Sequence, residues 1–148
     1  MSNSIPDLWP QDIAKQTIRA PAAILAEQAT RLADHTKGVV TAEVKPTKAP
    51  DPERITYNFN LVAPALNNYR MRLFSISHET ANIYPTRLND ALRKGSDGKM
   101  EKYELPNEAA LYDVLKDIFG RESTVTAVQS LIAQSEGVTP SSDEDLPF

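Results

Sequence analysis

The segment from Ile55 to Leu61 constrains the fold more than any other part of the chain. Its apolar residues, Ile55, Tyr57, Phe59 and Leu61, alternate with three polar ones. Successive side chains of a β-strand point to opposite faces, so this alternation predicts a half-buried strand with the apolar side chains in the core. Such a strand needs neighbouring strands and a cover for its apolar face.

The surrounding sequence supplies the neighbouring strands. The loop at Lys45–Glu53, rich in proline, and the connection through Pro64 and Asn67-Asn68 are short, which favours an antiparallel meander of three to five strands. Leu88–Leu92 predicts a short helical turn before the Gly95–Gly98 turn. The remaining strand candidates are 39–44, ending at Pro46, then 69–76, 81–84 and, as a strand or an extended loop, 99–105.

Helical patterns flank the strands on both sides. Pro21 suits a first helical position, apolar residues follow at helical spacing, and Gly38 is a plausible stop. Near the other end, Asn107 is expected to cap a helix that stops at Gly120, and Ser123 to cap a second helix that runs to Gln134. The first twenty residues predict an irregular arm, in which Leu8, Trp9 and Ile13 are expected to pack onto the body.

The predicted fold class is therefore α+β: an antiparallel sheet with an N-terminal helix and two C-terminal helices, followed by a flexible acidic tail. We expect one domain over residues 1–134, and a polar linker with an acidic docking tail over residues 135–148. The chain has no cysteine, no apolar run long enough to span a bilayer and no signal-peptide pattern at its N-terminus. A soluble cytoplasmic protein is the expectation.

The net charge of −4 is unevenly distributed. Residues 54–102 hold eight bases and four acids, whereas residues 138–148 hold three acids and no base. The centre of the chain is therefore basic and its end acidic. A local basic patch can bind phosphates even on an acidic protein, although solvated surface charge is the simpler interpretation of the counts alone.

The tail combines three acids with an apolar tip. Phe148 offers a ring for an apolar pocket, and as the last residue it also offers an α-carboxylate that a base beside the pocket could hold. Pro147 restricts its own φ and favours an extended Leu146, which lowers the entropy lost on docking. Asp143, Glu144 and Asp145 would steer the peptide toward a basic rim. A tail that serves only solubility has no reason to end in Leu-Pro-Phe.

These six residues, Asp143-Glu144-Asp145-Leu146-Pro147-Phe148, resemble the acidic tip of bacterial single-stranded DNA-binding proteins. The resemblance implies that the tip recruits replication, recombination and repair proteins, with Pro147 and Phe148 as anchors and the three acids as the electrostatic guide. It covers the tail only. The body lacks the N-terminal strand opening and the five-strand OB pattern of that family, and its C-terminal third is helical.

In the body, the segment Tyr69–Ile76 is the strongest candidate for nucleic-acid binding. On a regular strand Arg70, Arg72 and Phe74 share one face, where they could follow a phosphate backbone and stack a base. The competing interpretation places Phe74 and Ile76 in the core and the arginines at a rim. Tyr57 and Phe59 are expected to be core residues. The further bases predicted to bind nucleic acid are Arg87, Arg93 and Lys94.

No pattern predicts catalysis, a metal site or a cofactor. His35 and His78 are the only histidines, and neither belongs to a metal-ligand or nucleophile motif. With five glycines the chain forms no glycine-rich phosphate loop. We therefore expect a protein that is not an enzyme.

Three hypotheses follow. In the first, the basic strands bind single-stranded DNA and the tail recruits DNA-maintenance proteins. Such a protein could be carried by a phage, a plasmid or another mobile element, or be an analogue of the single-strand binder without its OB fold. In the second, the body does not bind DNA, and the protein uses its tail to occupy the tip-binding pockets of such enzymes. In the third, the chain is a small homo-oligomeric domain whose edge strands and C-terminal helices form the interface.

Overall fold

The structure, a computed structural model, describes residues 5–47, 52–94 and 98–138. Over these residues five strands form one antiparallel sheet in the order of the sequence, β1-β2-β3-β4-β5. The strands are β1 Thr41–Thr47, β2 Arg54–Ala63, β3 Tyr69–Glu79, β4 Asn82–Lys94 and β5 Met100–Leu105. A short 3₁₀ helix, Pro64–Leu66, connects β2 to β3.

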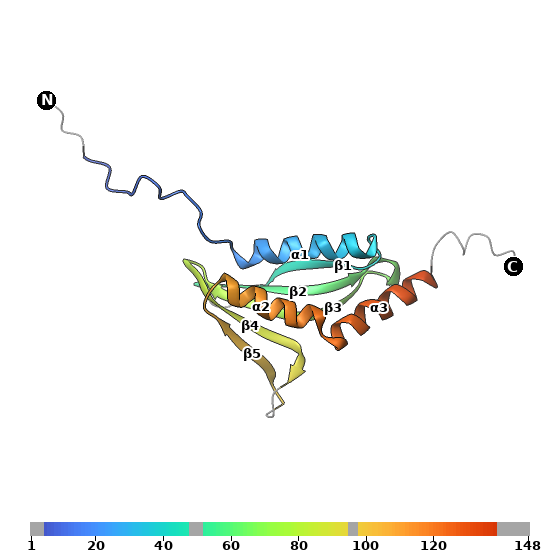
Figure 1. Cartoon of the computed structure of the whole chain (residues 1–148). Coiled ribbons are helices and arrows are strands. Elements are labelled where there is room, and N and C mark those ends of the chain that lie inside the picture. Colours follow the sequence, from blue (N-terminus) through green and yellow to red (C-terminus); the bar gives the residue numbers. More distant parts are fainter. Residues whose placement is uncertain (1–4, 48–51, 95–97, 139–148) are drawn as a thin grey trace, which may run out of the picture.

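Three helices, α1 (Pro21–Thr36), α2 (Glu108–Gly120) and α3 (Glu122–Glu136), gather on one side of this sheet (Figure 1). The apolar side chains of the helices and of one sheet face form a single core. The predicted α+β class, with one helix before the sheet and two after it, is confirmed.

Two predictions about strands are wrong. Leu88–Leu92 is not a helical turn but part of the long strand β4, where Leu88 pairs with both Ile76 and Tyr103. The first strand does not end at Pro46 but continues through it. Because β1 is at the edge of the sheet, a proline there need not donate to a second neighbour.

The turn after α1 sends the chain straight back into β1. Lys37 and Gly38 both have positive φ, and the Gly38 N–H donates to the Ala33 carbonyl at 2.8 Å, which closes the helix. The Thr36 hydroxyl donates to the Val40 carbonyl at 2.7 Å and accepts from the Val40 N–H at 3.1 Å. These bonds hold α1 against the edge strand.

Aromatic side chains form the centre of the core. Phe59 of β2 stacks on Phe74 of β3 at 5.0 Å between ring centroids, and Phe119 of α2 leans on both. Next to this pair the register shifts, since Phe59 lies opposite Phe74 but Asn60 lies opposite Arg72. Leu73 is thus the extra residue of a β-bulge, and it is buried like its neighbour Phe74.

A buried ion pair fixes the junction of α2 and α3 to the sheet. Arg121, between the two helices, donates from Nη1 to Asp90 of β4 at 2.7 Å and from Nη2 to Asp117 at 3.0 Å. Burial alone would lower the pKa of Arg121, but the hydrogen bonds with Asp90 and Asp117 outweigh that effect and raise the pKa. Arg121 is also the N-cap position of α3, and Ser123, the predicted cap, lies inside the helix.

The N-terminal arm does not pack onto the body as predicted. All residues from 5 to 20 are exposed, including Leu8, Trp9 and Ile13. Among the described residues, hydrogen bonds join the base of the arm to the body: the Arg19 N–H donates to Glu108 at 3.0 Å, and the Tyr84 hydroxyl donates to the Arg19 carbonyl at 3.1 Å. Burial, together with Glu108 and Tyr112, raises the pKa of Tyr84 to about 12, so this hydroxyl keeps its proton at neutral pH.

No helix among the described residues is both long enough and apolar enough to cross a membrane.

Candidate nucleic-acid interface

One face of the sheet is covered by the helices, and the other, here called the open face, is polar. On β2 and β3 the register places the open-face residues opposite one another, for example Asn58 opposite Ser75 and Thr56 opposite Ser77. The core residues Phe59, Phe74 and Leu88 alternate with them on the helix side. The open face therefore consists mainly of amide, hydroxyl and charged side chains.

Arginines lie on three adjacent strands of the open face. Arg54 of β2 donates to the Ser77 hydroxyl at 3.2 Å, and Ser77 is paired with Arg87 of β4. Arg72 lies further along β3, opposite Asn60. Within the described residues, the side chains of Arg72 and Arg87 make no hydrogen bond and no ion pair, and both residues are exposed. Their guanidinium groups are thus available to bind an anion.

Arg70, unlike Arg72 and Arg87, has an ion-pair partner. Its Nε donates to Glu43 of β1 at 2.8 Å, and Asn60 donates to the same carboxylate oxygen at 3.1 Å. The hydrogen bond from Asn60 is the largest influence on Glu43, and with Arg70 it holds the pKa of that carboxyl below its usual value despite partial burial. Glu43 is therefore ionised at neutral pH and neutralises Arg70.

The predicted grouping of Arg70, Arg72 and Phe74 on one face is wrong. The bulge at Leu73 reverses the alternation, so the two arginines point to the open face and Phe74 points into the core. Phe74 is 0% exposed and cannot stack on a base. The competing interpretation, which placed Phe74 and Ile76 in the core, is confirmed. Tyr57 and Phe59 are core residues as predicted.

The other predicted binding residues are spread along the chain. Arg87 joins the open face, whereas Arg93 is exposed near the end of β4 and Lys94 is its last residue, beyond a register shift that follows Asp90. The six predicted docking residues, Asp143 to Phe148, lie outside the described residues. Sequence reasoning did not include Arg54 among the binding residues. A single arginine at the start of a strand does not indicate a binding site until the strand order shows that it lies near Arg87.

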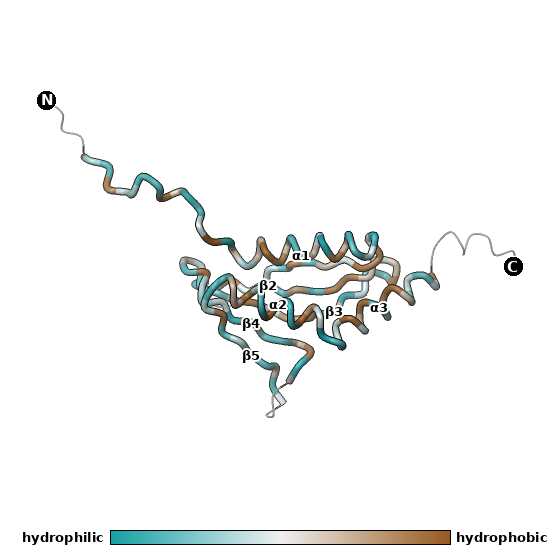
Figure 2. Tube along the Cα trace, in the orientation of Figure 1, coloured by the Kyte–Doolittle hydropathy of each residue, from teal (hydrophilic) through white to brown (hydrophobic). Residues whose placement is uncertain are grey.

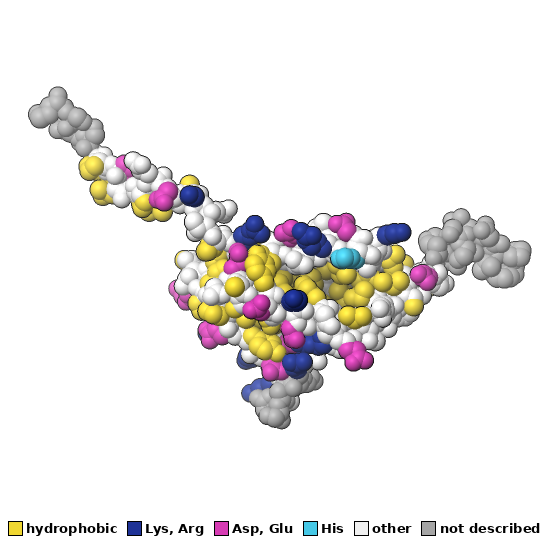
Figure 3. Space-filling model, in the orientation of Figure 1, with side chains coloured by type: hydrophobic (Ala, Val, Ile, Leu, Met, Phe, Trp, Pro, Cys, Tyr) yellow, Lys and Arg dark blue, Asp and Glu magenta, His cyan; other side chains and the backbone are white. Residues whose placement is uncertain are grey.

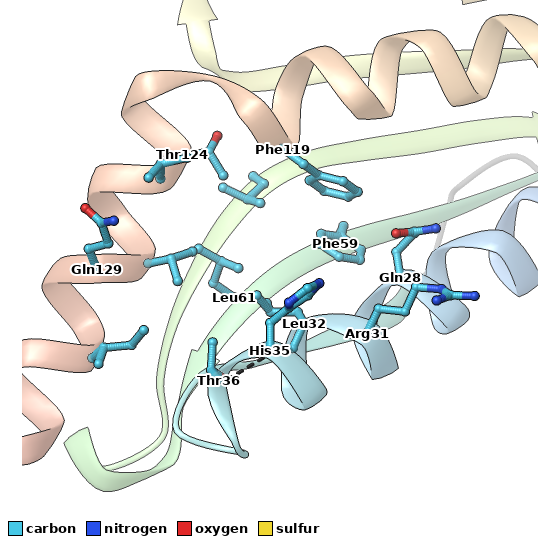
Figure 4. A pocket seen from close by; sticks show the side chains of 14 residues that line it. Gln28, Arg31, Leu32, His35, Thr36, Phe59, Leu61, Phe119, Thr124 and Gln129 are labelled. Atoms are coloured by element: carbon cyan, nitrogen blue, oxygen red, sulfur yellow. Dashed lines mark hydrogen bonds between the residues drawn. The ribbon is translucent and has the colours of Figure 1, made fainter.

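The helix side has a feature that the sequence did not predict, an apolar groove between α1 and α3. Its volume is about 470 Å³, and its floor includes Phe59, Leu61 and Leu73. Figure 3 shows a hollow lined with hydrophobic side chains beneath α1. In Figure 4, Arg31 and His35 project from α1 on one side, while Thr124 and Gln129 belong to α3 on the other.

The histidines have separate surroundings. His78 is buried, with Nδ1 at 2.9 Å from the Glu79 carbonyl, and His35 is at the rim of the groove. In the part of the chain that the structure describes, no three histidine, aspartate or glutamate side chains are grouped as metal ligands would be.

Comparison with known proteins gave no match to a family model, to a curated protein or to a solved structure.

Proposed function

We propose that this protein binds single-stranded DNA on the open face of its sheet and recruits DNA-maintenance proteins through its acidic tail. The observation that carries the DNA-binding half is the set of arginines on adjacent strands, of which Arg72 and Arg87 are unpaired within the described structure. Phosphate groups are the natural partners of such guanidinium groups, because the planar fork donates two parallel hydrogen bonds.

The spacing of the arginines suits an extended strand of nucleic acid. Arg72 and the position paired with Arg87, Ser77, are five residues apart on β3, which is about 15 Å along the strand. The open face between them presents the partly exposed amides of Asn58 and Asn89. These groups can donate to phosphate and sugar oxygens or to base edges.

Stacking contributes little to this mode of binding. The aromatic side chains on the described strands lie on the helix side of the sheet, as Phe59 and Phe74 do. Binding by charge and hydrogen bonds alone is independent of sequence and falls steeply with salt. We therefore propose a weak, salt-sensitive contact, which suits a protein that exchanges rapidly along exposed strands in the cytoplasm.

The tail supplies the second half of the proposal. Its support is the order of residues 143–148, an acidic triplet followed by Leu-Pro-Phe, which resembles the tip of bacterial single-stranded DNA-binding proteins. A recruiting tail is most useful on a protein that is already bound to DNA. Docking would bury Phe148, and the acids would guide the tail to a basic rim.

Fluorescence anisotropy with a labelled oligothymidine tests the open face. The double variant Arg72→Ala/Arg87→Ala is expected to weaken binding and to reduce the slope of log K against log salt by about 1.4, since each phosphate contact on a single strand contributes about 0.7. Lys116→Ala, which removes one exposed positive charge from the helix side, is the control and should change little. Wild-type protein that does not bind at low salt would end the DNA-binding half of the proposal.

A second candidate function has support in one observation, the absence of an aromatic side chain from the described open face. In this alternative the body does not bind DNA, and the tail occupies the tip-binding pockets of DNA-maintenance enzymes. A competition assay separates the two: the protein would displace a labelled tip peptide from such an enzyme and yet not bind the oligonucleotide. Under both candidates, deletion of Phe148 should abolish the displacement, and displacement that survives this deletion would remove the tail from the proposal.

A further inference from the structure

The described part of the N-terminal arm carries apolar side chains that are exposed to solvent. Five of its large hydrophobic residues are more than half exposed: Ile5 (86%), Leu8 (83%), Trp9 (71%), Ile13 (61%) and Ile18 (54%). Figure 2 shows separate hydrophobic stretches, in brown, along the largely hydrophilic arm. An isolated exposed apolar residue is ordinary, but five in sixteen consecutive residues form an exposed apolar segment of the kind that marks an interaction site.

The same molecule has an apolar groove that no described residue fills. The groove between α1 and α3 has a volume of about 470 Å³, within the range of pockets that enclose a small ligand, and so it can take an indole with a neighbouring aliphatic side chain. Val125 of α3 borders it and is 39% exposed. Arg31, which pairs with Glu27 at 3.0 Å, and His35 lie at its rim, and the first part of the arm carries Asp7 and Asp12 beside Leu8, Trp9 and Ile13.

The arm of one chain is badly placed to fill the groove of the same chain. Hydrogen bonds at Arg19 hold the base of the arm beside the start of α1, and from there the arm leads away from the body (Figure 1). The groove is bordered by residues 28–36, in the later part of α1. To reach it, the arm would have to reverse at Ala20 and run back along the helix.

We propose that the arm of one copy docks in the α1–α3 groove of a second copy, with Leu8 and Trp9 as the inserted side chains. Two copies related by a two-fold axis can exchange arms in both directions, so that each arm and each groove is covered in one closed dimer. Local turns already shape the inserted segment: the Trp9 N–H donates to Asp7 at 3.1 Å and the Ile13 N–H to the Pro10 carbonyl at 3.2 Å. This interface differs from the sheet edges, and it is independent of DNA binding.

The chain offers a direct probe, because Trp9 is its only tryptophan. In the full-length protein we expect a mass of twice 16.4 kDa by sedimentation, and Trp9 emission typical of a buried indole that shifts to longer wavelength on dilution. Val125→Glu, at the border of the groove, should produce monomer with solvent-exposed emission. The matched control Ala109→Glu, on the exposed surface of α2, should leave the dimer unchanged.

Cross-linking identifies the chain to which the docked arm belongs. The protein has no cysteine, so one chain with Leu8→Cys and another with Gln129→Cys can be mixed and oxidised. We expect a disulfide between the two chains, and none when Lys116→Cys replaces Gln129→Cys. A monomer with exposed Trp9 at all concentrations would overturn the proposal. So would a buried Trp9 in a monomer that cross-links only within one chain carrying both Leu8→Cys and Gln129→Cys.

Discussion

Arg70 and Arg72 lie two residues apart on the same face of β3 and yet have opposite roles. Glu43 neutralises Arg70, and Asn60 holds the Glu43 carboxylate in place. Arg72 has no such partner within the described residues. On the proposed binding face Glu43 is therefore an internal competitor, since an incoming phosphate would have to displace it from Arg70.

Glu43→Gln should therefore strengthen binding. The amide removes a negative charge from the open face and releases Arg70, and we expect an increase of about two- to fivefold in oligonucleotide affinity by anisotropy at low salt, the scale of an exposed ion pair. Glu27→Gln is the matched control, because Glu27 also pairs with an arginine, Arg31, but on the helix side. Equal gains for both variants would mean that net charge alone, rather than this site, governs binding.

The ion pair of Asp90 and Arg121 belongs to stability rather than to binding. Asp90 is 0% exposed, so Asp90→Ala leaves the nearly buried Arg121 without its main partner, and we expect the free energy of unfolding in urea to fall by about 3–5 kcal/mol. Asp117→Ala removes the other carboxylate that contacts Arg121, but that side chain is 61% exposed, and a loss below about 1 kcal/mol is expected. Similar decreases in the free energy of unfolding for Asp90→Ala and Asp117→Ala would contradict the larger role given to the buried carboxylate.

At the scale of elements, local signals predicted the helices well and the faces of the strands poorly. Pro21 and Gly38 bracket α1, and Asn107 caps α2, because each of these residues acts on its own backbone neighbourhood. The bulge at Leu73 and the strand character of Leu88–Leu92 depend on pairing with other strands. Asp90 also made β4 hard to predict. A charged residue is unexpected in a buried strand position, and its partner Arg121 is 31 residues further along the chain.

The candidate site shows the same division. The sequence identified Arg70, Arg72 and Arg87, which the structure brings to one face, but it assigned Phe74 to them because one extra residue reverses the alternation. The α1–α3 groove gave no local signal, as its walls come from opposite ends of the chain. The docking tail was predicted from residues 143–148 alone and stays a prediction.

Helix caps give a clean test at this scale. The Asn107 side chain accepts from the Ala110 N–H at 2.9 Å, so Asn107→Ala should lower the free energy of unfolding by about 1 kcal/mol. Ser123 lies within α3 and makes no capping bond, so Ser123→Ala should change stability by less than half as much. Urea denaturation of both variants measures this, and a loss at Ser123 as large as that at Asn107 would contradict the assignment of the caps.

At the scale of the whole molecule, the proposed DNA-binding face and the acidic tail belong to one chain, so we expect the tail to compete with DNA for the open face. A tethered acidic segment has a high effective concentration near the face, and this competition is screened by salt. Replacing the acids of the tail (Asp143→Asn, Glu144→Gln, Asp145→Asn) should raise oligonucleotide affinity several-fold at low salt and leave it unchanged at high salt.

Deletion of Phe148 is the matched control for this prediction. It leaves the three acids in place, so DNA binding should stay as in the wild type while docking to partner proteins is lost. If the charge-neutral tail gave no gain in affinity at low salt, the tail and the DNA would not share a site.

The order of the strands determines how the chain can fold while it is being synthesised. Each strand pairs with its neighbour in sequence, so the sheet closes only short loops, and topologies of this kind fold quickly. The α1–α3 groove is different, since its walls are residues 28–36 and 119–132 and the whole sheet lies between them in the chain. During synthesis the arm emerges before the far wall of the groove. A nascent chain that still lacks residues 119–132 has no groove to bind the arm of another chain. We therefore expect the proposed exchange of arms to occur only between completely synthesised chains.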